Sequence, residues 1–224
     1  MQNISRNATR TLIPIAVLFL LLTLASCASR TGLYPQGYAV ASWYGSEFHG
    51  RPTSSGETFN MYALTCAHRE YPFGTQLRVT NVDNQKAVSC VVNDRGPFVA
   101  GRDIDLSYAA AKEIGLIGKG TGHVSVEHMG RDIAYIREVK YMSRSGPFTI
   151  QVGSFSDYGN AVRLKNSLEL KYERVYIMNT EIKGETFYRV RIGKYPLRDE
   201  AYIFAKTLAE EGYAVLVTRY EERI

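Results

Sequence analysis

The stretch FTIQVGSF at residues 148–155 has the alternating apolar pattern of a β-strand. DYGNAVRLKNSLELKY (157–172) follows with helical spacing, and Asp157 lies near its start. Two further strand patterns, RVYIMNTEI (174–182) and TFYRVRIGKY (186–195), are joined by a turn at residues 183–185. A helix pattern, RDEAYIFAKTLAEE (198–211), and a strand pattern, YAVLVTRY (213–220), complete the order βαββαβ. This order predicts a ferredoxin-like α+β unit of about 75 residues.

In this fold both helices cover one face of the sheet and the other face is open. Because side chains alternate along a strand, Ile150, Val152, Val190 and Ile192 are expected to face the helices. The open face is then expected to carry Gln151, Phe155, Phe187, Arg189 and Arg191. Rings that stack on sugars and polar groups that bond hydroxyls suit a glycan, although an ordinary solvated face has the same pattern.

The preceding part of the chain predicts a small β-barrel. Short strand patterns are separated by Gly, Pro, Asn and Asp turns, and they are YAVASWYG, YALTCAH, QLRVTNV, KAVSCVVNDR and HVSVEHM. The clear helix pattern is SYAAAKEIG, with Ser107 as N-cap and Gly115 as the stop. A break at residues 142–147 separates the two parts, so we expect a barrel over 37–141, a linker over 142–146 and the α+β domain over 147–224.

Titratable and aromatic residues in or beside the turns of the barrel are candidates for chemistry. Cleavage of a glycosidic bond needs a carboxylic acid that protonates the leaving oxygen, and Glu57 and Asp94 carry such groups. His68 is a third titratable residue in or beside these turns. Trp43 beside Tyr44 is a possible sugar platform. Each residue has a structural alternative: an Asp94–Arg95 ion pair, a solvated Glu57, a satisfied strand His68, a core Trp43 and, further on, a hydrogen-bonding Asp105.

The first 26 residues have the pattern of a secretory signal. Arg6 and Arg10 precede an apolar run from Leu12 to Leu24 that is shorter than the roughly 20 residues of a membrane-spanning helix. A cysteine, Cys27, follows directly, which resembles the lipobox of bacterial lipoproteins; the alternative is an ordinary signal peptide with an incidental cysteine. Residues 27–36 are then a lipidated N-terminus and spacer. The following domains are expected in the periplasm, at the periplasmic face of the outer membrane.

The remaining cysteines and the charge narrow the choice of ligands. In an oxidising periplasm Cys66 and Cys90 can form a disulfide, and two buried thiols are the alternative. Cys66, His68 and Cys90 lack zinc-type spacing, and His123 and His128 fall on opposite faces of one strand, so we expect no metal and no cofactor. The formal net charge is +5, which is too mild and too evenly spread to indicate a nucleic-acid partner.

The motifs resemble two known families. Gln151-Val152-Gly153-Ser154-Phe155 and YRVRIG at residues 188–193 are similar to the paired signatures of SPOR domains, which bind septal peptidoglycan lacking stem peptides. ASWYG, FHGR, SGE, PFGT, RVTN, NDRGPF and GRDIDLS resemble, in order, the double-psi β-barrel of the rare lipoprotein A (RlpA) family. Asn60 stands where we expect that family to have Asp, and Cys66 and Cys90 replace small or aliphatic residues.

The resemblance implies a function and assigns residues to it. It implies a lytic transglycosylase that cleaves between N-acetylmuramic acid and N-acetylglucosamine at the division septum, with Asp94, Glu57 and His68 as its catalytic residues. The residues then expected to contact glycan are Trp43, Tyr44, Gln151, Ser154 and Arg191. Acylated Cys27 is expected to anchor the chain in the lipid bilayer. The alternatives are a hydrolase and a non-catalytic, expansin-like wall binder.

Overall fold

The computed structural model describes residues 37–221, so the predicted signal peptide, the lipidation site at Cys27 and the spacer lie outside the described residues. The described residues belong to one compact unit, which contains both predicted domains. Within the described range, none of the helices is long and apolar enough to cross a membrane.

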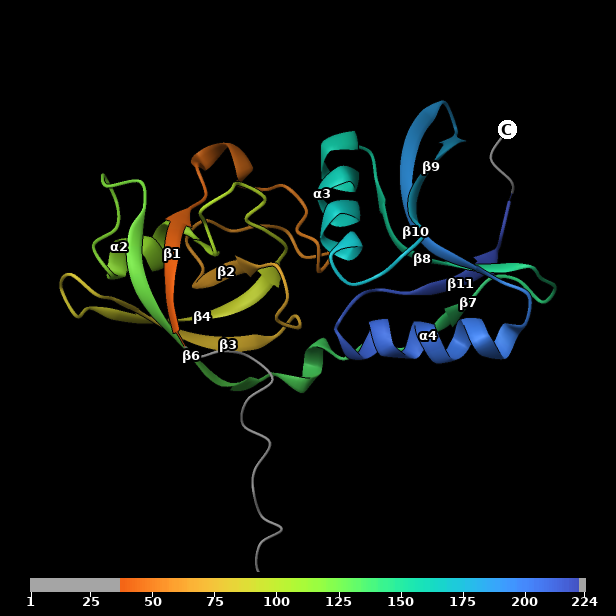
Figure 1. Cartoon of the computed structure of the whole chain (residues 1–224). Helices are drawn as coiled ribbons and strands as arrows, with labels where there is room; N and C mark the ends of the chain where they lie inside the picture. Colours follow the sequence, from red (N-terminus) through yellow and green to blue (C-terminus); the bar gives the residue numbers. More distant parts are fainter. Residues whose placement is uncertain (1–36, 222–224) are drawn as a thin grey trace, which may run out of the picture. The chain divides into compact units, whose positions relative to one another are not determined.

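The first domain is a closed barrel (Figure 1) with the strand order β1-β5-β2-β4-β3-β6. Parallel pairs (β1 with β5, β2 with β4) are combined with antiparallel ones, as expected for interlocked crossovers rather than simple hairpins. The strands are β1 Gly37–Trp43, β2 Thr65–His68, β3 Thr75–Asn81, β4 Ala87–Asp94, β5 Ile104–Leu106 and β6 Gly122–Arg131.

The barrel interior follows from the alternation of its strands. In β3, Leu77 and Val79 are fully buried while Gln76 and Arg78 are exposed. Leu77 lies opposite Cys90 of β4, and Cys90 forms a disulfide with Cys66 of β2, with 6.0 Å between the Cα atoms. The disulfide therefore connects the two parallel strands that end in His68 and Asp94.

The helix of the barrel, α2 (Tyr108–Glu113), begins where the sequence predicts. Ser107 Oγ accepts the N–H of Ala110 (3.1 Å) and donates to the carbonyl of Ala63 (2.6 Å), so the N-cap also holds the preceding loop. The barrel also contains a strand that the sequence analysis did not identify, β5 (Ile104–Leu106). It is only three residues long, and all of them are buried, so it has no alternation to detect.

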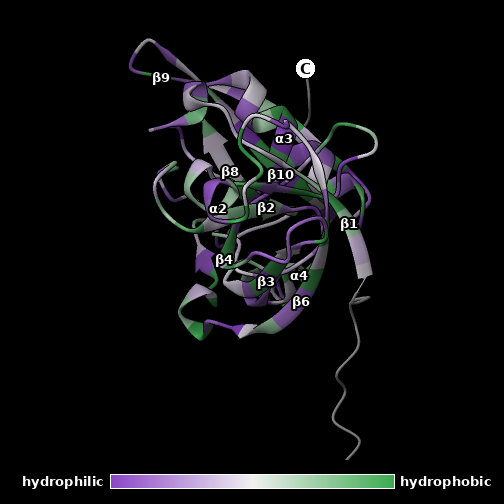
Figure 2. Ribbon diagram, turned by 90° about the vertical axis from the view of Figure 1, so that its left-hand side faces the viewer, coloured by the Kyte–Doolittle hydropathy of each residue, from purple (hydrophilic) through white to green (hydrophobic). Residues whose placement is uncertain are grey.

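The second domain contains a five-stranded sheet in the order β7-β11-β8-β10-β9 (Figure 1). Helices α3 (Tyr158–Glu169) and α4 (Arg198–Glu210) pack on it, and Asp157 caps α3 by accepting the N–H of Asn160 (2.9 Å). Figure 2 shows that apolar and polar residues follow each other along the same elements, as in one-sided sheets and helices. The strands are β7 Lys140–Tyr141, β8 Phe148–Phe155, β9 Val175–Ile182, β10 Glu185–Tyr195 and β11 Leu216–Arg219.

The structure moves the boundary between the domains. Lys140 and Tyr141 were expected at the end of the barrel, but they form β7 and pair in parallel with β11 of the second sheet. The backbone N–H groups of Lys140 and Met142 donate to the carbonyls of Val215 (3.2 Å) and Val217 (2.9 Å). A two-residue edge strand with both side chains exposed carries no period, which is why the pattern missed it.

A bulge also changes which side chains share a face of the second sheet. Val190 pairs with Gly153 and Arg191 pairs with Gln151, so Val152 is an extra residue in β8. A Cβ on Gly153 would lie 2.6 Å from Phe155 and 2.7 Å from Leu164 of α3. Gly153 and Phe155 therefore lie toward the helix, and the expectation that Phe155 is on the open face is wrong.

Candidate active site

Asp94 is the last residue of β4, and its carboxylate is held by its surroundings. Oδ1 accepts the backbone N–H groups of Ser54 and Arg95, both at 2.8 Å, and Oδ2 accepts the hydroxyl of Tyr44 at 3.2 Å. Burial, and then the charges of Asp94 and Asp105, raise the pKa of Tyr44, so its hydroxyl stays protonated and acts as a donor. These contacts fix the orientation of a half-buried carboxylate that still has exposed surface.

Glu57 reaches the same end of β4 through a turn. Its Oε2 accepts the side-chain N–H of Asn93 at 2.7 Å, and the backbone N–H of Ser55 donates to the Asn93 carbonyl at 3.3 Å. The turn requires Gly56, whose φ is +90°. Since Ser54 of this turn donates to Asp94 and Asn93 donates to Glu57, the turn and the end of β4 each hold a carboxylate of the other.

A β-bulge changes the directions of the side chains at this end of β4. Cys66 of β2 pairs with Val92, but Ala67 pairs with Asp94, so Asn93 is the extra residue of β4. A bulge re-aims side chains locally and is common beside active sites. The hydroxyl of Tyr135 also bonds Glu57; burial first, and then this bond, raise the pKa of Tyr135.

His68 ends β2, and its ring is held as a neutral imidazole. Nδ1 accepts the backbone N–H groups of Glu70 and Tyr71, both at 3.1 Å, which places the proton on Nε2. Burial, and then the charges of Arg95 and Arg69, lower the pKa of His68 to about 3. His68 was expected to orient Asp94 or a sugar hydroxyl; because Nδ1 is used by the backbone of its own loop, the N–H at Nε2 is the group left for that role.

Arg95 does not form the ion pair with Asp94 that the sequence left open. Its guanidinium is buried; Nη1 donates to the carbonyl of Tyr71 at 2.9 Å, and Nε donates to the hydroxyl of Tyr213 at 2.7 Å. Asp105 does have the structural role that the sequence suggested, since it accepts the hydroxyl of Ser42 and an ion pair from Arg102 at 3.1 Å. Burial raises the pKa of Asp105.

A cavity of about 410 Å³, lined in part by Tyr44, Arg95 and Asp105, is large enough for a sugar. Trp43 is half-buried on its wall, with its ring 5.9 Å from that of Tyr108 in an edge-to-face contact. Arg163 of α3 also borders the cavity, with its guanidinium carbon 5.5 Å from the ring centre of Phe48. The cavity is lined by aromatic and charged side chains that include Trp43, Tyr44, Phe48, Phe98, Asp105 and Arg163.

The residues expected to bind glycan in the second domain differ in accessibility. Ser154 is exposed at the end of β8 and Gln151 is half-buried. Arg191, in contrast, is 1% exposed; its Nη1 contacts Met178 Sδ (3.0 Å) and Glu221 Oε2 (3.4 Å), so the expectation of a free, outward guanidinium is wrong. Glu221, which forms this ion pair, lies in the segment after β11.

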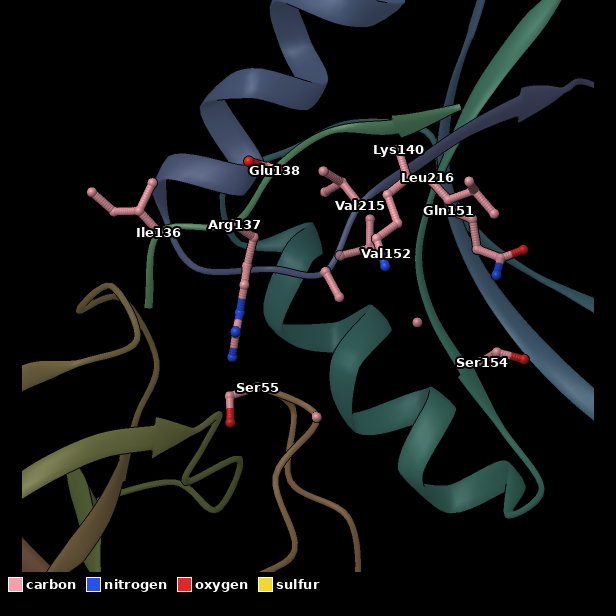
Figure 3. Close-up of a pocket in the computed structure, with 13 residues that line it drawn as sticks. Ser55, Ile136, Arg137, Glu138, Lys140, Gln151, Val152, Ser154, Val215 and Leu216 are labelled. Atoms are coloured by element: carbon pink, nitrogen blue, oxygen red, sulfur yellow. The ribbon is translucent and has the colours of Figure 1, made fainter. Parts of the chain in front are cut away.

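Gln151 and Ser154 also border a second cavity of about 680 Å³. Figure 3 shows Arg137 directed toward Ser55 on one side of this cavity, while the side chains of Gln151 and Ser154 point away from both. Within residues 37–221, no group of three His, Cys, Asp or Glu side chains is arranged to hold a metal ion.

Sequence reasoning missed the residues that position the candidate acids. Ser54 acts through its backbone N–H, which no side-chain motif reveals, and Asn93 was read only as part of a turn. Tyr44 was expected to contact sugar, and the bond from its hydroxyl to Asp94 is a further role that the sequence did not indicate. Tyr213 lies more than a hundred residues from Arg95, so only the fold brings them together.

Comparisons with known proteins identify two domain families in the chain. Residues 37–126 match the family described as lytic transglycolase, and residues 144–219 match the SPOR domain family. Solved structures that resemble the chain include the Streptomyces papain inhibitor, with 16% identity and a TM-score of 0.35 over 43% of this chain and 96% of that one.

Two of the named relatives are similar over about three quarters of the chain. The endolytic peptidoglycan transglycosylase RlpA of Campylobacter jejuni is 37% identical over 79% of this chain and 70% of that protein. The protein of the same name from Helicobacter pylori strain J99 is 34% identical over 75% of this chain and 59% of its own length. That from Pseudomonas aeruginosa strain PAO1 is 54% identical, but over 39% of this chain and 26% of its own.

Proposed function

The chain belongs to the RlpA family, and from that membership and the geometry of the site we propose that it cleaves peptidoglycan glycan strands by lytic transglycosylation. This chain combines a lytic transglycolase domain with a SPOR domain. The substrate class is therefore cell-wall glycan, and the place of action is the periplasm.

One observation carries the proposal: the end of β4 and the turn of residues 53–57 hold two carboxylates, and Tyr44, which donates to one of them, lines an aromatic cavity. Asp94 is fixed by Ser54 and Tyr44, and Glu57 is fixed by Asn93. The 410 Å³ cavity is lined by Trp43, by Tyr44 and by Arg95, which follows Asp94 in the chain. Cleavage of a glycosidic bond needs a carboxyl group that protonates the leaving oxygen, and the ring of Trp43 offers a surface on which a sugar stacks.

We infer that Asp94 is the general acid and base. As its proton passes to the oxygen that links N-acetylmuramic acid to N-acetylglucosamine, the bond from that oxygen to the anomeric carbon breaks. The 6-hydroxyl oxygen of the muramyl sugar then attacks the same carbon, and its proton returns to Asp94. The products are a 1,6-anhydromuramyl end and a free 4-hydroxyl, and no water is consumed.

The neighbours of Asp94 divide the remaining tasks. Tyr44 keeps its proton and orients the carboxylate throughout the reaction. Glu57 faces the positive charge that develops at the anomeric carbon or positions the sugar. His68 is neutral with its proton on Nε2, so it serves as a hydrogen-bond donor to a sugar hydroxyl and not as a cation.

The second domain supplies affinity for the wall. We propose that it holds septal glycan strands lacking stem peptides, which raises the concentration of substrate at the barrel. Ser154 is accessible for a direct contact, and Gln151 is half-exposed beside it. Buried Arg191 is excluded from direct contact; its ion pair with Glu221 supports the sheet instead.

We further propose that acylated Cys27 anchors the protein to the outer membrane, with both domains in the periplasm and concentrated at the septum during daughter-cell separation. The support is the sequence alone, since Cys27 follows an apolar run with a basic start. Metabolic labelling with an alkyne fatty acid tests it, and a Cys27→Ser chain that still incorporates label would contradict it.

Product analysis tests the reaction. A soluble chain of residues 28–224 is incubated with intact peptidoglycan and with peptidoglycan stripped of stem peptides by an amidase, and the products are read by mass spectrometry. Anhydromuramyl ends, released preferentially from stripped glycan, are expected. Reducing ends would make the protein a hydrolase, and retention of glycan without any cleavage would make it an expansin-like wall binder.

A further inference from the structure

The structure joins the second domain to the strand end that carries Asp94. The contact centres on Tyr213, which follows α4, and on Arg95, which follows Asp94. The Nε of Arg95 donates to the hydroxyl of Tyr213 at 2.7 Å. Both residues are almost fully buried, with exposed fractions of 2% for Arg95 and 3% for Tyr213.

The guanidinium of Arg95 is held on several sides. Its central carbon lies 3.7 Å from the ring centre of Phe73 and 5.1 Å from that of Tyr213, which are cation–π distances. Nη1 donates to the carbonyls of Tyr71 (2.9 Å) and His68 (3.4 Å). The side chain of Arg95 thus contacts the backbone of His68, and the backbone N–H of Arg95 donates to the Asp94 carboxylate.

Arg95 is also a buried cation without an acidic partner among the described residues. Its Nη2 has no hydrogen-bond partner within residues 37–221. Buried charges are costly unless their polar atoms are satisfied, so each remaining acceptor is important. The hydroxyl of Tyr213 is the acceptor that comes from the second domain.

Backbone contacts hold Tyr213 in place against the barrel. The N–H of Phe73 donates to the carbonyl of Glu211, and the N–H of Arg137 donates to that of Ala209, both at 3.0 Å. Gly212 allows this approach, because its φ is +97° and a Cβ there would lie 3.0 Å from Phe73. The turn after α4 is therefore fitted to the loop between β2 and β3.

We propose that Tyr213 of the wall-binding domain is a positioning residue for the barrel's site, acting through Arg95 on the backbone that carries Asp94 and His68. The second domain is then part of the catalytic unit in addition to being an anchor. This inference rests on the proposed function for its catalytic readout, but its structural readout is independent of activity.

The test compares Tyr213→Phe with Tyr202→Phe in the chain of residues 28–224. Tyr213→Phe keeps the ring and removes the acceptor, whereas Tyr202 lies on α4 and is 41% exposed, away from Arg95. In Tyr213→Phe the buried guanidinium of Arg95 loses an acceptor. We therefore expect kcat to fall about tenfold, with KM and glycan retention unchanged. Tyr202→Phe is expected to keep the kcat of the parent.

A double-mutant cycle with Arg95→Lys separates positioning from general destabilisation. Because both residues act through one contact, Tyr213→Phe is expected to lower kcat further by less than twofold in the Arg95→Lys background. Full, independent effects of the two substitutions, or an unchanged kcat in Tyr213→Phe, would overturn the proposal. A lower melting temperature with unchanged kcat at 20 °C would show a purely structural role and would also overturn it.

Amide NMR shifts provide the readout that does not need activity. Tyr213→Phe is expected to move the backbone amide signals of Ser54, His68 and Asp94, and Tyr202→Phe to leave them in place. If the parent chain makes no anhydromuramyl ends, the proposed function fails while these shifts still decide the role of Tyr213. Unmoved signals in Tyr213→Phe would contradict that role whether or not the chain is active.

Discussion

Removing the disulfide between Cys66 and Cys90 is expected to destabilise the barrel by about 3.4 kcal/mol. The two residues are 24 positions apart, and the loss of chain entropy on closing a loop of that length gives this value at 25 °C. For a chain of this size, such a loss lowers the melting temperature by about 10 °C. Because the disulfide joins β2 to β4, its loss acts on the strands that end in His68 and Asp94.

The measurement uses urea unfolding of residues 28–224, which contain Cys66 and Cys90 but not Cys27. Trp43 is the chain's single tryptophan and belongs to β1, so its fluorescence reports on the barrel. The parent chain in oxidising buffer is compared with the same chain in reductant and with Cys66→Ala/Cys90→Ala. The reduced parent retains both sulfur atoms, which separates the effect of the cross-link from the effect of lost packing.

Equal unfolding free energies for the oxidised and reduced parent would refute this reasoning. A loss below about 1 kcal/mol would show that the unfolded chain is already compact around this loop, so that the entropy calculation does not apply. At 20 °C the reduced chain is expected to keep its activity.

Other predictions concern single side chains of the site. The neutral form of His68 stabilises the fold fully above pH 6.5, and this contribution is lost as pH falls toward about 3; His68→Asn should therefore remove a slope of up to about 1.4 kcal/mol per pH unit from urea unfolding in that window. If the acid limb is the same in both chains, the histidine is not responsible. Tyr44→Phe should lower kcat about tenfold at constant KM, because the carboxylate at the end of β4 loses a donor, whereas the exposed control Tyr62→Phe should not; equal rates would contradict the role. Gly56→Ala should cost about 1 kcal/mol because φ is +90°, and Gly37→Ala, with open space and no positive φ, should cost less in the same denaturation assay; equal costs would show that the turn adapts.

Regular elements could be predicted from the sequence because their periods are clear. The pattern of residues 148–155 predicted β8 with its observed bounds, and Ser107 marked the start of α2. The same alternation rule failed where the strand is irregular. The bulge at Val152 turns Phe155 toward α3, and no residue type in FTIQVGSF indicates that bulge.

The candidate site could be predicted as a set of residues but not as an arrangement. Glu57, His68 and Asp94 were identified from their chemistry and their motifs, and the disulfide was left open between two alternatives. The bulge at Asn93 and the backbone N–H of Ser54 set the geometry, and neither has a sequence signal. Burial of Arg191 was missed because its cover, Glu221, comes from the end of the chain.

The comparison of Asp94→Asn with Asp83→Asn tests the central claim most directly. Asp83 pairs on the surface with Lys119 at 3.4 Å, so its substitution makes the same chemical change away from the site. Release of anhydromuramyl ends from stripped peptidoglycan is measured for both chains, together with their retention on that glycan. The account predicts loss of release by at least about a hundredfold in Asp94→Asn with retention unchanged, and full release in Asp83→Asn. Release by Asp94→Asn at the rate of the parent chain would contradict it.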